Sequence, residues 1–277
     1  MNLLLNKQTV LCISLASHPG NFGNYFHNYL YQYYGLNYLY KSCSTDNLKL
    51  SVKAIVALKI RGCGVSMPFK SDILEYVDHL DLPVKEIGAA NTIVNNKNIL
   101  TAYNTDCYSL SSILAHKKIP LASKVLIKGS GGMAKAVVYS MKKYGINDIA
   151  INARNEITRA ELADKWGLQI MTDQQLNDKK FDIIINATPL GMENFHKVSP
   201  FNKDLIKRSN LVIDVVVNPN RTEISKICDH YSIPLVGGEI ITKLQAKKQF
   251  ELYTGQIAQD KAVDEAYKYY ISLVGSQ

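Results

Sequence analysis

The sequence contains no long hydrophobic run. None of its segments reaches the roughly eighteen consecutive apolar residues that a membrane-spanning helix needs. The N-terminal stretch MNLLLNKQTVLCISL also lacks the basic region and the small-residue cleavage site of a signal peptide. These absences argue against a membrane protein and against secretion, so we expect a cytoplasmic protein.

Cysteine is scarce, and histidine shows no metal-binding pattern. The five cysteines are an odd number, are widely scattered and include no C-x-x-C pair. The six histidines show neither H-x-x-x-H spacing nor a neighbouring cluster of ligands. We therefore expect reduced thiols, no disulfide framework and no structural metal.

The chain carries an excess of positive charge, +8 with a pI near 9.0. Such a charge raises the question of nucleic-acid binding. The basic residues are spread along the chain, however, and no recognisable nucleic-acid motif accompanies them. We expect a basic surface that attracts small anions and no nucleic-acid partner.

Strands and helices are predicted to alternate along a chain of ordinary globular composition, with 47% apolar residues. In the first part, strands are expected at 9–15, 37–43 and 60–66, helices at 22–34, near 46–56 and at 69–80, and a hairpin at 92–96 and 98–104. A helix is expected directly after Asp106. From residue 124 onward, strands at 124–128, 148–155, 182–187 and 211–217 alternate with helices, which predicts a doubly wound parallel sheet.

A glycine-rich motif follows the strand at 124–128. It reads GSGGMA, has the spacing G-x-G-x-x-A and leads into a helix that reaches Lys143. Between a strand and a helix, this spacing is typical of a dinucleotide-binding loop. The residues predicted to bind the cofactor there are Gly129, Gly131, Gly132, Met133 and Ala134. The alternative is a turn that merely begins a helix.

The next strand indicates which dinucleotide is bound. An NAD-binding domain usually ends this strand with an acidic residue, but here it ends in Asn152-Ala153-Arg154-Asn155. The guanidinium of Arg154 suits the 2′-phosphate of NADP. A solvated arginine at a strand end is the alternative. We predict that Asn152 and Arg154 bind the cofactor and that the cofactor is NADP.

The order of motifs resembles the shikimate dehydrogenases from about residue 10 to residue 256. The motifs are VSMPFK, IGAANTIV, AYNTD, KGSGGMAKA, INARN, NATPLGM, DVVVNP and GGEIITKLQAKKQFELYTG. The chain is most similar to the shikimate dehydrogenase-like branch of this family. The resemblance implies an oxidoreductase of aromatic amino-acid biosynthesis (the chorismate pathway) that reversibly oxidises the ring hydroxyl of shikimate to a ketone with NADP.

The resemblance also implies an α/β fold with two domains. Residues 1–106, completed by the C-terminal helices 240–277, would form the substrate domain. Residues 107–239 would form the Rossmann domain, a doubly wound parallel sheet that binds NADP. The active site is expected between the two domains.

The resemblance assigns catalysis to Lys70, in the VSMPFK turn, and to Asp106, in the N-T-D motif. Hydride can leave the carbinol carbon only if the hydroxyl proton leaves as well, so a base must lie within hydrogen-bond reach. An ordinary lysine, with a pKa of about 10.4, is a poor base at neutral pH. Burial would lower this pKa, and the neighbouring carboxylate of Asp106 would hold and orient the ammonium group. The residues leave open which member of the pair carries the proton.

Further residues are implied to bind the ligands. Ser66 and Asn91 would contact the substrate, and Gln245 would reach its hydroxyls from a C-terminal helix. Thr188 and Gly238 would border the nicotinamide end of the cofactor. The alternatives are a turn-capping role for Asn91 and a solvent-facing position on an amphipathic helix for Gln245.

The chain departs from the family in the segment S-x-S-P-x-x-H-N, whose serines bind the shikimate carboxylate. Asn21 and Gly23 stand in their places, and Val217 replaces a tyrosine before Asn218-Pro219. We expect Asn21 to contact the substrate and shikimate to be used with reduced efficiency.

Three alternative functions remain open. The chain could be a dehydrogenase of a related cyclic polyol or hydroxy acid such as quinate, a folate-type dehydrogenase, or a sensor module that binds NADP. The Lys70–Asp106 pair argues against a pure sensor. A monomer and a homodimer are both compatible with the sequence.

Overall fold

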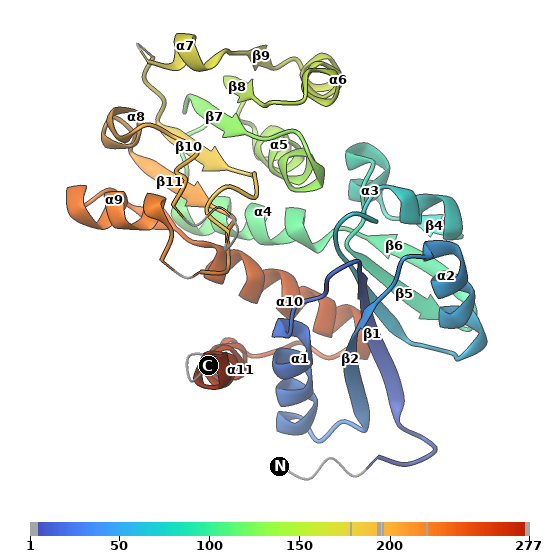
Figure 1. The fold of residues 1–277 in the computed structure, drawn as a ribbon. Coiled ribbons are helices and arrows are strands. Elements are labelled where there is room, and N and C mark those ends of the chain that lie inside the picture. The colour runs from blue at the N-terminus through green and yellow to red at the C-terminus, as the bar shows by residue number, and fades with distance from the viewer. Residues whose placement is uncertain (1–4, 178, 193–194, 196, 220, 275–277) are drawn as a thin grey trace. The chain divides into compact units, whose positions relative to one another are not determined.

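The computed structural model describes residues 5–177, 179–192, 195, 197–219 and 221–274. The chain divides into two compact units. Unit 1 consists of residues 1–105 and 243–277, which are blue to teal and red in Figure 1. Unit 2 consists of residues 106–242. The chain therefore leaves unit 1 directly before Asp106 and returns to it at Lys243.

Unit 1 is built on a six-stranded mixed sheet with the order β2-β1-β3-β5-β6-β4. Its strands are β1 (Val10–Ala16), β2 (Tyr38–Ser44), β3 (Gly62–Val65), β4 (His79–Leu80), β5 (Thr92–Asn96) and β6 (Ile99–Tyr103). Strands β1, β2 and β3 are parallel, whereas β5 is antiparallel to both β3 and β6. The predicted strands and the hairpin are confirmed.

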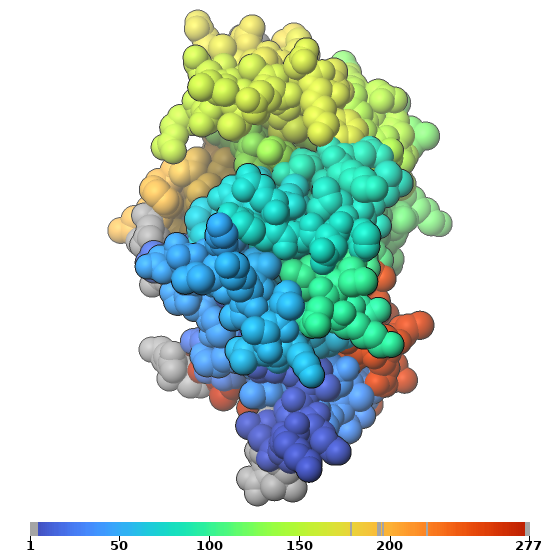
Figure 2. Space-filling view, turned by 90° about the vertical axis from the view of Figure 1, so that its right-hand side faces the viewer, coloured from blue at the N-terminus to red at the C-terminus, as the bar shows by residue number. Residues whose placement is uncertain are grey.

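Alternate residues of β1 face two different cores. Ile13 and Leu15 point into an aliphatic core together with residues of α2 (Leu48–Ala57), the 3₁₀ helix η1 (Asp72–Tyr76) and α3 (Leu82–Ile87). Figure 2 shows this side of unit 1 from outside, with α2 in blue and the segment around α3 in cyan.

Cys12, on the other face of β1, belongs to a core rich in aromatic rings. This core is shared with α1 (Phe22–Tyr33), α10 (Gly238–Thr254) and α11 (Asp260–Val274). Its largest fully buried side chains include Phe26, Tyr31, Phe250 and Tyr253. The C-terminal helices thus complete the core of the N-terminal sheet.

The open edge of β2 is covered by side chains of α1. The carboxamide of Asn28 pairs with both backbone groups of Tyr40, at 2.8 Å each, and Oδ1 of Asn24 accepts the N–H of Ser42 at 2.6 Å. These bonds satisfy the polar groups that an edge strand exposes. They also fix α1 against the strand that carries Tyr40.

The helix predicted at 69–80 is wrong. The segment forms η1 and then β4, which pairs with β6. The backbone N–H of Asp78 donates to the carbonyl of Leu100, and the carboxylate of Asp78 accepts the N–H of Leu100. This pairing with a distant strand overrides the local helical pattern.

Unit 2 is built on a six-stranded parallel sheet with the order β12-β11-β10-β7-β8-β9. Its strands are β7 (Val125–Lys128), β8 (Ile149–Asn152), β9 (Gln169–Ile170), β10 (Ile183–Asn186), β11 (Leu211–Asp214) and β12 (Leu235–Val236). Its helices are α4 (Thr105–Lys117), α5 (Gly132–Tyr144), α6 (Glu156–Trp166), α7 (Asp173–Leu176), α8 (Lys203–Lys207) and α9 (Glu223–Tyr231). This order is that of a doubly wound dinucleotide-binding sheet, as predicted, with its switch point between β7 and β10.

Within the described ranges, no helix is both long enough and apolar enough to cross a bilayer.

Candidate functional site

The loop after β7 lies at the switch point of the unit 2 sheet. Gly129 has a φ of 120°, and a Cβ at this position would lie 2.7 Å from the carbonyl oxygen of Ala187, which follows β10. The N–H of Gly129 donates to the carbonyl of Asn152 at 2.8 Å. Both the backbone conformation and the close approach of the two loops therefore require glycine at this position.

Gly131 has a different role, because it leaves space open. It is the N-cap of α5, it is exposed, and a Cβ there would meet no protein atom within 4 Å. Gly132 and Met133 form the half-buried start of the helix, while Ala134 is fully buried. The unpaired N–H groups of a helix N-terminus beside open space fit a pyrophosphate group.

The end of β8 presents one of the two predicted cofactor residues to solvent and buries the other. Asn152 is buried, and its Nδ2 donates to the carbonyl of Met171 at 2.9 Å. Arg154 is exposed just before α6, whose first turn is capped by Asn155. Arg159, which the sequence analysis did not single out, donates from Nη1 to the carbonyl of Ala153 at 2.9 Å.

A buried polar network supports the loop after β10. The hydroxyl of Thr188 donates to Oδ1 of Asn186 at 2.6 Å, and Nδ2 of Asn186 donates to Asp214 at 2.9 Å. The hydroxyl of Thr222 donates to the other carboxylate oxygen of Asp214 at 2.8 Å. Burial raises the pKa of Asp214, and these hydrogen bonds partly oppose the shift. Thr188 is therefore held by Asn186 and, through it, by Asp214, which begin the NATPLGM and DVVVNP motifs and to which the sequence analysis assigned no role.

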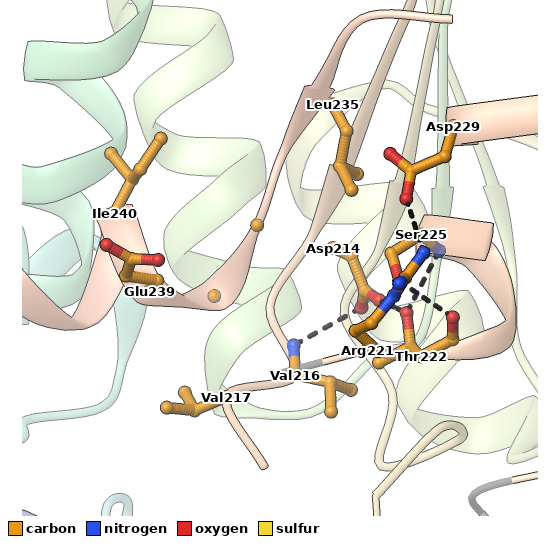
Figure 3. A pocket seen from close by; sticks show the side chains of 12 residues that line it. Asp214, Val216, Val217, Arg221, Thr222, Ser225, Asp229, Leu235, Glu239 and Ile240 are labelled. Atoms are coloured by element: carbon orange, nitrogen blue, oxygen red, sulfur yellow. Dashed lines mark hydrogen bonds and ion pairs between the residues drawn. The ribbon is translucent and has the colours of Figure 1, made fainter. Parts of the chain in front are cut away.

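A cavity of about 280 Å³ lies where β11 ends, next to the start of α9 and the turn before α10 (Figure 3). Val217 and Glu239 line it, and an ion pair between Arg221 and Asp229 (2.9 Å) lies among its lining residues. A Cβ at Gly238 would overlap the carbonyl oxygen of Val216. Glycine at 238 is therefore required by the close approach of two backbone segments.

In unit 1, the VSMPFK turn is tied to the sheet by backbone hydrogen bonds. The N–H of Ser66 donates to Leu15 at 2.9 Å, and the buried ring of Phe69 anchors the turn in the aliphatic core. The carbonyl of Lys70 accepts the N–H of Ala90 at 2.7 Å. Ser66 is exposed and Lys70 is half-buried. The turn thus fixes the backbone of Lys70 beside the segment that carries Asn91.

Asn91 is 2% exposed, and only the oxygen end of its carboxamide is hydrogen-bonded to described residues of the protein. Its Oδ1 accepts from the hydroxyl of Thr92 at 2.9 Å and from the N–H of Thr105 at 2.8 Å. Its Nδ2 has no hydrogen-bond partner in the part of the chain that the structure describes. The amide N–H₂ is therefore a buried donor that a ligand could satisfy.

Asp106 follows Thr105 and lies fully buried in the first turn of α4. The positive end of a helix dipole favours a carboxylate there. Lys70 belongs to unit 1 and Asp106 to unit 2. Within unit 1, the carbonyl of Lys70 and the N–H of Thr105, the residue before Asp106, are both hydrogen-bonded to the Ala90–Asn91 segment.

The structure gives a physical reason for the departure at Gly23. A Cβ there would lie 2.6 Å from the ring of Tyr40, so this ring fills the space that a side chain would need. The ring stacks on His27 at 4.4 Å between centroids. Asn21, the N-cap of α1, is exposed and accepts a hydrogen bond from Asn24 at 3.2 Å.

Two glutamines of α10 differ in their surroundings. Gln245, the predicted substrate contact, is half-buried. Gln249, one turn later, is buried and bonded to Asn91 and Thr92. Sequence reasoning missed Gln249 because its partners, Asn91 and Thr92, lie far away along the chain.

No cluster of His, Cys, Asp or Glu among the described residues could hold a metal.

Comparisons with known proteins place these features in one family. A family model of the shikimate dehydrogenase substrate binding domain matches residues 23–93. A shikimate dehydrogenase-like protein of Haemophilus influenzae is 38% identical over 265 residues, covering 95% of this chain and 97% of that protein. A shikimate dehydrogenase (NADP(+)) of Clostridium beijerinckii is 35% identical over 231 residues, covering 82% of this chain and 85% of that protein. A solved shikimate dehydrogenase in complex with NADP+ matches with a TM-score of 0.88 at 27% identity, covering 97% of this chain and 98% of that one.

The fold and the loop after β7 define a two-unit α/β protein with a dinucleotide-binding sheet. The similarity over nearly the whole chain then identifies the family. The chain belongs to the shikimate dehydrogenase family.

Proposed function

We propose that this protein is an NADP-dependent dehydrogenase that interconverts shikimate and 3-dehydroshikimate in aromatic amino-acid biosynthesis. The observation that carries the proposal is the hydrogen bonding around Asn91. The segments of Lys70 and Thr105 are both bonded to the Ala90–Asn91 segment, while Nδ2 of Asn91 remains available as a buried donor. Relatives that are 35% and 32% identical are named shikimate dehydrogenase (NADP(+)).

The nucleotide loop supports NADP as the cofactor. The open space beside Gly131 and the N-terminus of α5 suit the pyrophosphate, and the exposed guanidinium of Arg154 suits a 2′-phosphate. We assign Gly129 and Ala134 to shaping the loop, and Thr188 and Gly238 to the nicotinamide end. When bound, NADP supplies the acceptor for the hydride of the substrate carbinol.

In the proposed reaction, the protein removes a proton and orients the ring. Lys70 and Asp106 act as a pair that accepts the hydroxyl proton as the carbinol becomes a ketone, and returns it in the reverse direction. Asn91 donates from Nδ2 to a ring hydroxyl, and Ser66 and Gln245 contact the substrate from the VSMPFK turn and from α10. Holding the hydroxyl in line lowers the entropic cost of the transfer.

We also propose that the substrate carboxylate is bound more weakly than in an ordinary family member. The ring of Tyr40 takes the space next to Gly23 that a serine would need, and Asn21 retains an amide donor.

Since the cysteines are thiols rather than disulfides, we expect the enzyme to work in the reducing cytoplasm.

A product assay tests the function. Purified protein is incubated with NADP and either shikimate or quinate, NADPH is followed by absorbance, and the organic product is identified by mass spectrometry. We expect 3-dehydroshikimate in equal amount to NADPH. NADPH formation with quinate alone, or NADP binding without turnover of either compound, would contradict the proposal.

A further inference from the structure

A buried glutamine outside the predicted site motifs lies directly beside Asn91. Gln249 is 5% exposed, and its Nε2 donates to the carbonyl of Asn91 at 3.2 Å and to Oγ1 of Thr92 at 2.9 Å. Its neighbours on α10, Ala246 and Phe250, belong to the apolar core. An amide in such surroundings is costly to bury unless its polar atoms are bonded. Both N–H groups of Gln249 are therefore committed to Asn91 and Thr92, where β5 begins.

These bonds fix the direction of a hydroxyl hydrogen. Oγ1 of Thr92 accepts from Gln249, and a hydroxyl has only one hydrogen to donate. That hydrogen is directed to Oδ1 of Asn91, 2.9 Å away. Gln249 thus adds, through Thr92, to the bond from the N–H of Thr105 that keeps Oδ1 of Asn91 facing the protein, although the two side chains do not bond each other directly.

His27, on α1, is a neighbour of Gln249. Burial lowers the pKa of His27 to about 3, so the ring is neutral, and the side chain of Gln249 partly opposes this shift. The ring is held by stacking on Tyr40.

We propose that Gln249 is a positioning residue that turns the amide N–H₂ of Asn91 toward a hydroxyl oxygen of the substrate. The inference rests on the proposed function for the identity of that substrate, but not for the orientation of the amide. Without Gln249, the hydroxyl of Thr92 is free to rotate. Asn91 then loses one of the bonds that distinguish its two carboxamide orientations.

The kinetic test uses Gln249→Met, which has similar length and no donor. We expect kcat/KM for shikimate to fall about tenfold to a hundredfold, while KM for NADP changes by less than about twofold. In an Asn91→Ala background the same substitution should add less than about a twofold loss, because its effect passes through Asn91. An equal loss in both backgrounds would overturn the proposal.

A matched control separates positioning from general packing. Thr254→Val removes a hydroxyl from the same helix, where Oγ1 donates to the carbonyl of Phe250 at 2.8 Å. This variant should retain the wild-type kcat/KM. A loss as large as that of Gln249→Met would assign the effect to the helix as a whole and contradict the proposal.

A second readout needs no turnover. In ¹⁵N-labelled protein, the side-chain amide of Asn91 should give one shifted pair of signals, which moves or broadens in Gln249→Met but not in Thr254→Val. Unchanged Asn91 signals in Gln249→Met would overturn the positioning role. If wild-type protein fails to oxidise shikimate, the proposed function is wrong, and the amide signals still decide the role of Gln249.

Discussion

The two units present their candidate ligand sites with different parts of the chain. In unit 2, the loop after β7 offers backbone N–H groups and open space beside Gly131. In unit 1, the donor is a side chain, Asn91, which is held by Thr92, Thr105 and Gln249. Backbone recognition tolerates many surrounding sequences, whereas a side-chain network depends on each of its members.

The units also differ in how far they follow the family pattern. Unit 2 keeps the glycine motif and an arginine after β8. Unit 1 keeps Lys70 and Asn91 but has Asn21 and Gly23 at the two positions that we propose for carboxylate contacts, and the ring of Tyr40 lies against Gly23. The family reaction and the cofactor are thus retained, and we propose that the contacts to the substrate carboxylate have changed.

The largest effect is expected at Lys70, the proposed catalytic lysine of unit 1. Lys70→Ala should lower kcat by roughly 10²–10⁴, the usual contribution of a positioned acid–base group, and leave NADP binding in unit 2 unchanged. Steady-state kinetics and NADP titration of the folded variant measure both quantities. An unchanged kcat would remove Lys70 from the mechanism.

In unit 2, the arginine after β8 should control the choice of cofactor. Arg154→Ala removes charge-assisted hydrogen bonds to the 2′-phosphate, so NADP affinity should fall by about ten- to a hundredfold while NAD affinity barely changes. Titrations with both cofactors measure the difference. Equal losses for NADP and NAD would show that Arg154 supports the fold instead.

Two glycines of the same loop should separate folding from binding. Gly129→Ala is expected to destabilise the protein by about 1–3 kcal/mol, because its φ is 120° and its Cβ would contact Ala187. Gly131→Ala should leave stability within about 0.5 kcal/mol of wild type but weaken NADP, since its Cβ enters the open space. Urea unfolding measures the stability of each variant, and NADP titration measures its affinity for the cofactor. Unchanged NADP affinity in Gly131→Ala would contradict the binding of a pyrophosphate beside this glycine.

The smallest effect concerns pH and His27 in unit 1. The pKa of this buried ring is lowered to about 3 from a usual value of about 6.5. The unfolded chain therefore takes up a proton first, and the stability that neutral His27 contributes above pH 6.5 is lost as pH falls toward 3. Between pH 7.5 and 5.5 we expect a loss of roughly 1–2 kcal/mol in urea unfolding. His27→Gln should reduce this pH dependence, and an identical dependence in the variant would contradict the burial of a neutral ring.

The sequence predicted unit 2 better than the details of unit 1. The β7 loop could be predicted because all of its parts are consecutive, and the parallel sheet followed from the alternation of strands and helices. The helix at 69–80 was wrong because Asp78 pairs with Leu100. Gln249 was missed because it bonds Asn91, 158 residues away. The clash that favours glycine at 23 could not be foreseen either, since it depends on how Tyr40 packs across α1.

The central claim is that this chain keeps the family reaction while holding the substrate carboxylate less firmly. The most direct test compares kcat/KM for shikimate with kcat/KM for its methyl ester. We expect slow turnover of shikimate relative to an ordinary family member, because up to two hydrogen bonds of roughly 1.5–3 kcal/mol each are lost at Asn21 and Gly23, and only a modest further drop for the ester. A severe drop on esterification, with shikimate itself used at ordinary family efficiency, would contradict the account and show that other groups have rebuilt the carboxylate site.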